Sequence, residues 1–147
     1  VLMVHSLKYD YYKFPGGGIE PGEDRLAALC REVREESGYE VLPGSIREFG
    51  MVLRISKGEK RDVFYQENFY YLCDVTGPVG QQLDDYEAEE RFTPEFVDPK
   101  TVIETNRFHD HGGKDGVMLE REALVLEALA REGFLSEGTG YSGSHPL

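Results

Sequence analysis

The sequence lacks the features that mark membrane or secreted proteins. No apolar run is long enough to span a bilayer, and no signal-peptide pattern opens the chain. Only two cysteines occur, Cys30 and Cys73, and their positions suit buried reduced thiols better than a disulfide or a metal-binding pair. We therefore predict a cytoplasmic protein without a membrane partner.

Basic residues are also scarce. Lys and Arg number 16 against 28 Asp and Glu, which gives a formal net charge of -12. A charge of this sign repels polyanions, so we do not expect a nucleic-acid polymer as the main partner. A small nucleotide whose phosphates arrive with a divalent metal ion is a better match. With 147 residues, the chain suits a single domain with a real hydrophobic core.

One predicted helix carries an unusual acidic face. Glu32, Glu35 and Glu36 stand at positions i, i+3 and i+4, which places them on one side of a helix. Repulsion between three like charges costs stability unless a cation lies among them. Beside this face runs an apolar stripe of Leu26, Cys30, Val33 and Ser37. We expect the stripe to pack on the core and the carboxylates to face a cleft.

Glycine and proline mark the ends of this helix. The run 15–18 and the pair Pro21 and Gly22 are turn signals, so the helix is entered from a tight loop near Glu23 and Asp24. Gly38 ends it as a left-handed C-cap. An ordinary solvated helix face explains the charges in this segment, but it does not explain the spacing of the glycines.

The complete pattern resembles the Nudix box. The positions that fill it are Gly17, Glu23, Arg31, Glu32, Val33, Glu35, Glu36, Gly38 and Tyr39. Tyr39 is the one mild departure, because the family usually has an aliphatic residue there. The resemblance covers Val1 to about Glu132 and implies an α/β fold, a Nudix-type α/β/α sandwich with a mixed β-sheet. We expect a domain over 1–135, a flexible tail over 136–147, and further residues before Val1, where the family normally has another strand.

The resemblance also implies roles for individual residues. Glu32, Glu35, Glu36 and the carbonyl of Gly16 match the family's ligands for Mg²⁺, or for Mn²⁺ in its place, and Glu35 and Glu36 are the catalytic glutamates among them. Glu23 and Arg31 would pair to fix the loop against the helix. The resemblance also implies a further catalytic acidic residue from the run 84–90, as a base or an extra metal ligand. Glu87 is preferred over Glu90 and Glu89, and an acidic surface loop without a role is the alternative. His109 and His111 are left outside the catalytic set.

Downstream patterns predict the remaining elements. Strands are expected over 48–55 and 62–75 with a hairpin turn between them, and helices over 98–106 and 118–132. In the second strand, the face that begins with Val63 and Tyr65 is assigned to the core. The opposite face presents Gln66 and Asn68 among aromatic rings, as a substrate-binding wall for a nucleobase would, and a loop-covered sheet face is an equal alternative.

The family chemistry is hydrolysis of a nucleoside diphosphate linked to another group. Subfamily signatures for other substrates are missing from 54–57, which leaves a nucleoside triphosphate or modified nucleotide first and nucleotide sugars next. Two other classes remain: a non-enzymatic, nucleotide- or sugar-nucleotide-sensing domain, which commonly lacks box glutamates, and an isoprenoid diphosphate isomerase, which needs a pocket cysteine. The pattern also allows a homodimer.

Overall fold

The computed structural model describes residues 1–57, 63–135 and 145–146. The helices and strands follow the chain in this order: β1 (Leu2–Ser6), β2 (Tyr11–Lys13), α1 (Arg25–Ser37), β3 (Glu40–Val41), the 3₁₀ turn η1 (Pro43–Ser45), β4 (Arg47–Lys57), β5 (Val63–Cys73), β6 (Val75–Thr76), α2 (Asp85–Glu89), β7 (Phe92–Phe96), α3 (Pro99–Phe108), α4 (Gly116–Arg131) and β8 (His145–Pro146).

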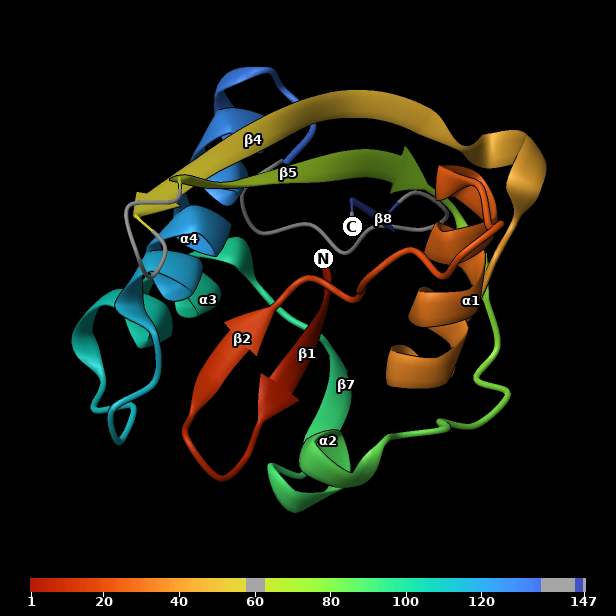
Figure 1. Cartoon of the computed structure of the whole chain (residues 1–147). Coiled ribbons are helices and arrows are strands. Elements are labelled where there is room, and N and C mark those ends of the chain that lie inside the picture. Colours follow the sequence, from red (N-terminus) through yellow and green to blue (C-terminus); the bar gives the residue numbers. More distant parts are fainter. Residues whose placement is uncertain (58–62, 136–144, 147) are drawn as a thin grey trace.

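Helices flank the strands on two sides. Figure 1 shows α1 on one side of β1, β2 and β7, and the antiparallel pair α3 and α4 on the other. The predicted α/β class is confirmed. In the described part of the chain, no helix combines the length and the apolar character needed to cross a membrane.

The strands form three small sheets, with the orders β2-β1-β7, β3-β6 and β4-β5-β8. Every pairing recorded among the described residues is antiparallel, so the single mixed sheet that was predicted is not observed there. One physical reason is the short connection between β1 and β2, which allows only antiparallel pairing. The expected turn between β4 and β5 lies mostly outside the described residues.

The core forms on both faces of β1. Successive side chains of a strand point to opposite faces, and the apolar run at the start of the chain fills both. Leu2 packs with Val33 of α1, whereas Met3 packs with Leu126 of α4. Each such buried side chain stabilises the fold by roughly 1.5 to 3 kcal/mol. β1 is therefore the central strand that joins the two helical layers.

Helix α1 begins and ends where the sequence predicts. The Asp24 side chain caps it by accepting a hydrogen bond from the amide of Ala27 at 2.7 Å, and Gly38 ends it with a φ of 77°. Val33 is fully buried in the packing stripe, but Leu26 is 46% exposed, which corrects its assignment to the core. A periodic pattern gives the direction of a stripe but not how far the core extends along it.

Other elements differ in detail from the predictions. At the end of β5, Tyr70, Tyr71, Leu72 and Cys73 are all buried, so both faces of this strand are covered and not the expected one alone. Cys73 is a buried free thiol and Cys30 a half-buried one. Of the predicted tail, only 145–146 lies within the described residues, and it pairs with β5 as β8. The predicted domain limits remain a prediction.

Candidate functional site

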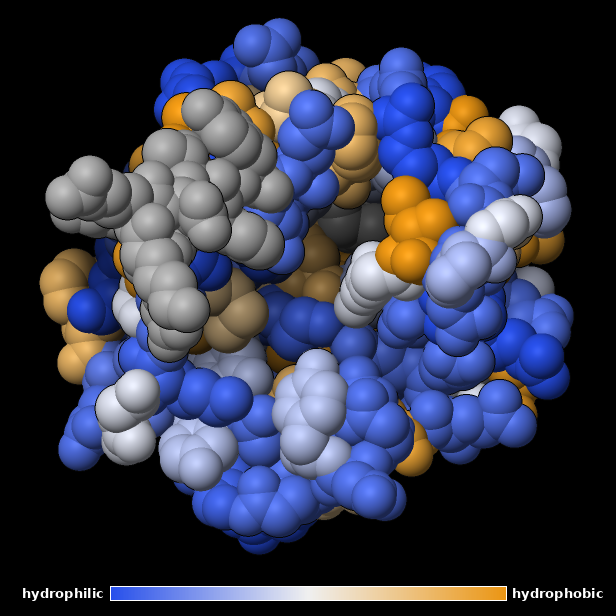
Figure 2. All heavy atoms as spheres, viewed as in Figure 1, coloured by the Kyte–Doolittle hydropathy of each residue, from blue (hydrophilic) through white to orange (hydrophobic). Residues whose placement is uncertain are grey.

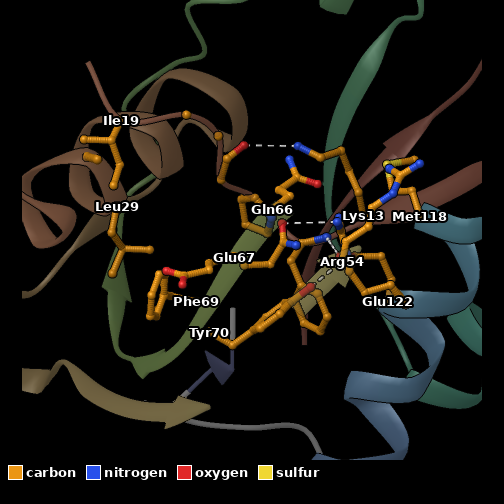
Figure 3. A pocket seen from close by; sticks show the side chains of 18 of the residues that line it. Lys13, Ile19, Leu29, Arg54, Gln66, Glu67, Phe69, Tyr70, Met118 and Glu122 are labelled. Carbon is orange, nitrogen blue, oxygen red and sulfur yellow. Dashed lines mark hydrogen bonds and ion pairs between the residues drawn. The ribbon is translucent and has the colours of Figure 1, made fainter. Parts of the chain in front are cut away.

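A pocket of about 660 Å³ lies between the glycine-rich loop, β5 and α4. Figure 2, which shows the molecule from the same side as Figure 1, has a hollow near the centre of this face. In the close view of Figure 3, Ile19, Leu29 and Phe69 lie toward one end, while Lys13 and Arg54 lie toward the other. One end of the pocket is thus mainly apolar, with Glu67 beside Phe69, and the other is positively charged, which suits an amphipathic ligand with an anionic group.

Cations are concentrated in this pocket, although the chain as a whole is acidic. The five basic residues in its lining are Lys13, Arg25, Arg54, Lys114 and Arg121. Arg54 pairs with Asp115 at 3.1 Å, and Arg121 pairs with Glu122 at 2.9 Å. The guanidinium of Arg25 lies 4.0 Å from the ring centroid of Phe69, a cation–π contact at the apolar end.

The amides that the sequence assigns to substrate both line the pocket. The Asn68 side chain accepts a hydrogen bond from Arg121 at 3.2 Å and donates one to the carbonyl of Val52 at 3.4 Å. Gln66 is exposed on the same face of β5. Their position suits hydrogen bonding to the polar edge of a bound ligand. Their role as substrate ligands remains a prediction.

Arg31 organises the acidic face of α1. Its guanidinium forms a bidentate ion pair with Glu23 at 2.8 and 2.9 Å. It also donates to Glu32 at 2.7 Å, to Glu35 at 3.2 Å and to the carbonyl of Gly18 at 3.0 Å. This hydrogen bonding to Arg31 lowers the pKa of Glu23 to about 2. A single side chain therefore ties the loop, the start of the helix and two helix carboxylates together.

Glu36 points away from Arg31 and is 1% exposed. Its Oε1 accepts a hydrogen bond from Lys13 Nζ at 2.6 Å and a longer one from the amide of Gly16 at 3.4 Å. Lys13 Nζ also donates to the carbonyl of Gly16 at 3.2 Å. Burial raises the pKa of Glu36 to about 8, against the opposing effect of Lys13, and a hydrogen bond with Glu87 adds to the rise.

Glu87 reaches Glu36 from a different element. It is buried on the short helix α2, where it forms a capping box with Asp84: the two side chains bond each other's backbone amides at 2.9 and 3.0 Å. Fifty-one positions separate it from Glu36, yet the carboxyl group of Glu87 is near enough to raise the pKa of Glu36. The structure thus brings together the helix glutamate and the preferred residue of the acidic run.

The two alternatives to Glu87 have other partners. The buried Glu90 side chain bonds the hydroxyl of Tyr11 at 3.0 Å and the ammonium of Lys114 at 3.0 Å. Glu89 pairs with Lys8 at the surface. Both residues are engaged in holding α2 and its surroundings together.

The structure does not present a ready metal centre. Across residues 1–57, 63–135 and 145–146, no three or more His, Cys, Asp or Glu side chains are gathered so as to hold a metal ion. Glu32, Glu35 and Glu36 are also absent from the pocket lining, although Gly16 and Gly17 belong to it. Arg31 draws Glu32 and Glu35 to one side, whereas Glu36 turns to Lys13.

The donor set nevertheless suits a hard divalent cation. Carboxylate and backbone carbonyl oxygens are the ligands that Mg²⁺ and Mn²⁺ prefer. Glu36 Oε1 and the carbonyl of Gly16 both contact one ammonium group, so they already converge on a positive charge. The predicted ligand roles are compatible with this arrangement and remain predictions.

Sequence reasoning missed Glu122. This α4 residue is 2% exposed and lines the pocket, where its carboxylate accepts hydrogen bonds from the amide of Phe14 at 2.8 Å and the hydroxyl of Tyr70 at 3.2 Å. A signal was present, because Glu122 stands at helical spacing between Leu119 and Leu126 on the apolar face. A carboxylate in that stripe indicates a buried polar anchor.

The two histidines outside the predicted catalytic set have structural partners. His109 Nδ1 lies 2.6 Å from a carboxylate oxygen of Asp10. The ring nitrogens of His111 contact the carbonyls of Tyr9 at 3.1 Å and Asn106 at 3.0 Å. Neither histidine belongs to the pocket lining.

Comparisons with known proteins link this chain to one family. A family model described as the NUDIX domain matches residues 1–118. The 8-oxo-(d)GTP phosphatase of Mycolicibacterium smegmatis is 30% identical over 125 residues, which cover 70% of this chain and 36% of that protein. Diphosphoinositol polyphosphate phosphohydrolase 2 from rat, and likewise from human, is 34% identical over 88 residues, 59% of this chain and 42% of the relative.

The matched regions span less than half of the length of these relatives. No solved structure matches the chain. The family model extends over most of the sequence and includes the loop and helix that carry Gly17, Arg31 and Glu36. The chain belongs to the Nudix family.

Proposed function

We propose that this chain is a metal-dependent Nudix pyrophosphohydrolase that cleaves a phosphoanhydride bond in a nucleoside triphosphate or a modified nucleotide. One observation carries the proposal: the buried Glu36 accepts hydrogen bonds from Lys13 and from the amide of Gly16, two residues that line the pocket, and Glu87 raises its pKa. Such a paired, desolvated carboxyl group is typical of catalytic sites.

Glu32, Glu35, Glu36 and the carbonyl of Gly16 would hold the metal, Mg²⁺ or Mn²⁺. When bound, such an ion neutralises phosphate charge and lowers the pKa of a coordinated water. Glu35 is the most exposed of these carboxylates, with 36% of its side chain accessible. Glu32 lies so close to Gly17 that the position of its carboxylate and the position of the loop depend on each other.

The remaining groups orient the reactants. Glu87, fixed by its capping box, accepts the proton of the attacking water, with Glu36 beside it. Arg31 keeps the loop and helix in register through Glu23 and the Gly18 carbonyl. Lys13 and the pocket arginines bind the substrate phosphates, and Gln66 and Asn68 bind the polar edge of the base.

The names of the relatives narrow the substrate class without fixing it. One is a phosphatase of an oxidised guanine nucleotide and the other acts on a diphosphoinositol polyphosphate. Both kinds of molecule join a ring to a phosphoanhydride. The aromatic and apolar end of the pocket, with Phe69 and Ile19, favours a nucleobase over a polyphosphorylated ring. A cytoplasmic location fits the two free thiols and is part of the same proposal, whereas a homodimer remains a sequence prediction.

A second function is favoured by one specific observation. The three helix carboxylates do not line the pocket, and Arg31 and Lys13 neutralise them internally. A non-enzymatic domain that senses a nucleotide or sugar nucleotide would have this arrangement, because binding needs the pocket cations but no metal. Such a domain would bind its ligand equally well with and without divalent metal.

The deciding experiment is a screen of nucleotides, oxidised nucleotides, nucleotide sugars and a diphosphoinositol polyphosphate, with release of phosphate or pyrophosphate as readout. We expect turnover of a nucleoside triphosphate in Mg²⁺, none in excess chelator, and little in Ca²⁺. Glu36→Gln should lose most of its activity. Glu104→Gln changes an exposed residue of α3, serves as a matched control and should remain active. Ligand binding without turnover under any metal condition would favour the sensing domain.

A further inference from the structure

Lys13 lies between the glycine-rich loop and helix α1, and it contacts both. Its ammonium lies 2.6 Å from Glu36 Oε1 and 3.2 Å from the carbonyl oxygen of Gly16. The side chain is 15% exposed and belongs to the pocket lining. Lys13 thus contacts buried acid on one side and has access to the pocket on the other.

The two oxygens held by Lys13 are among those that the proposed function assigns to the metal. A lone pair directed at an ammonium is not free for a metal ion, and two cations in one small space repel each other. The ammonium is a compact charge on a flexible four-carbon stem, so it can leave this position by rotation of its side chain. A guanidinium, which is planar and rigid, could not make the same movement as easily.

We propose that Lys13 is a mobile counter-cation that exchanges places with the divalent metal. Without metal, its ammonium donates hydrogen bonds to Glu36 and to the Gly16 carbonyl. When a divalent cation takes those two oxygens, the ammonium turns into the pocket and binds a phosphate of the substrate. This inference rests on the proposed function, since it requires Glu36 and Gly16 to be metal ligands.

The exchange couples two binding events. Metal binding releases Lys13 for the phosphate, and a bound phosphate withdraws Lys13 from the metal ligands, so each ligand strengthens the binding of the other. A lysine that served only to hold the fold together would give no such coupling. The two halves of the inference can therefore be measured separately from catalysis.

The first measurement is Mn²⁺ affinity, followed by the electron paramagnetic resonance signal of free Mn²⁺. Lys13→Met keeps the length of the side chain and removes its charge. We expect it to bind Mn²⁺ on the order of tenfold more tightly than the wild type, because a competing cation is gone. Lys8→Met makes the same change in net charge at the surface, where Lys8 pairs with Glu89, and should stay within about twofold of the wild type.

The second measurement is the affinity for a non-hydrolysable nucleoside triphosphate analogue with an imido bridge. With Ca²⁺ present, Lys13→Met should bind the analogue roughly tenfold more weakly, the loss expected for a charged phosphate contact. In chelator, wild type and variant should differ by less than about threefold, because Lys13 is then held by Glu36. An equal loss in both conditions overturns the exchange.

A third measurement uses the wild type and so does not depend on the folding of Lys13→Met. In a spectrum of protein with ¹³C at the lysine ε-carbons, the signal that is absent from Lys13→Arg belongs to Lys13 among the six lysines. We expect it to shift on addition of Mg²⁺. A stationary Lys13 signal at saturating Mg²⁺, or Mn²⁺ binding that is unchanged in Lys13→Met, refutes the inference while leaving the proposed hydrolase intact. If neither wild type nor Lys13→Met binds Mn²⁺, the proposed metal site itself is wrong.

Discussion

Gly17 lies so close to Glu32 that a Cβ at position 17 would stand 2.5 Å from the Oε2 atom of Glu32. The obstacle is the far end of a flexible side chain, so an alanine here would displace the carboxylate and not the backbone. Glu32 cannot move freely, however, because Arg31 holds its other oxygen at 2.7 Å. The glycine is therefore tied to the position of a predicted metal ligand.

This contact predicts different results for two adjacent glycines. Gly17→Ala should lower kcat/KM roughly 10- to 100-fold, since a displacement of about 1 Å at a reacting centre has effects of that size. Gly18→Ala is the matched control, because a Cβ there meets nothing within 4 Å, and it should retain nearly full activity. The measurement is kcat/KM of both variants in steady-state kinetics with Mg²⁺. Equal values would show that the Gly17 contact has no role in activity.

Replacement of Glu36 tests the catalytic assignment. Glu36→Gln preserves size and hydrogen bonding but removes the charge, so we expect kcat to fall by a factor on the order of 10² to 10⁴. Circular dichroism should show an intact fold. Undiminished kcat in this variant would reassign the chain to the class of non-enzymatic binders.

Glu87 and Glu90 should behave differently when each becomes glutamine. If Glu87 is the general base, Glu87→Gln should lower kcat at least as much as Glu36→Gln does. A smaller decrease in kcat would indicate that Glu87 is an auxiliary metal ligand. Glu90→Gln leaves Lys114 without its buried carboxylate and should lower the free energy of unfolding by about 1 to 3 kcal/mol with little change in kcat. Kinetics combined with denaturant titration separate the two roles, and a loss of kcat confined to Glu90→Gln would move the assignment to Glu90.

The raised pKa of Glu36 predicts a pH dependence of stability in the absence of metal. Between the ordinary value of 4.5 and about 8, the folded state binds more protons at this group than the unfolded state does. The slope of unfolding free energy against pH is then negative, so this group's contribution to stability is lost as pH rises. Relative to Glu36→Gln, the wild type should lose Tm across that window in chelator. A Tm difference that does not change with pH would contradict the raised pKa.

Arg31→Lys should loosen the loop although the charge is kept. A lysine cannot reproduce the bidentate pair with Glu23 together with the bonds to Glu32 and the Gly18 carbonyl. We expect amide hydrogen exchange in 17–24 to rise, with exchange in β1 unchanged. Arg34→Lys, on the exposed side of the same helix, is the control. Equal protection of 17–24 in both variants would show that Arg31 does not hold the loop.

Local features of the fold could be predicted from the sequence because neighbouring residues decide them. The start of α1 near Glu23 and Asp24 and the left-handed Gly38 depend on a few adjacent positions, and the structure confirms both predictions. The prediction that Leu26 packs on the core was wrong, because a helical period does not record how far the core extends along the helix. The separation of the strands into three sheets likewise depends on contacts between distant segments.

The features of the site likewise differ in whether they could be predicted from the sequence. The pairing of Arg31 with Glu23 joins residues of one short segment, so its spacing can be found in the sequence. The walls of the pocket come from the glycine-rich loop and from α1, β4, β5, α2 and α4, and nothing in the sequence indicates that Arg25 and Arg121 meet there. The choice of Glu87 came from family resemblance, because nothing in composition or periodicity places it beside Glu36.

The anchoring of the strand that leads to Gly16 has a practical consequence for protein engineering. Asn106 of α3 forms two hydrogen bonds with the backbone of Tyr12, and Glu122 of α4 accepts one from the amide of Phe14. The two helices therefore hold this strand in place. Gln66 lies on a different sheet and takes no part in that support. Libraries that vary Gln66 alone should change ligand selectivity while leaving the hydrogen bonds from Asn106 and Glu122 to this strand intact.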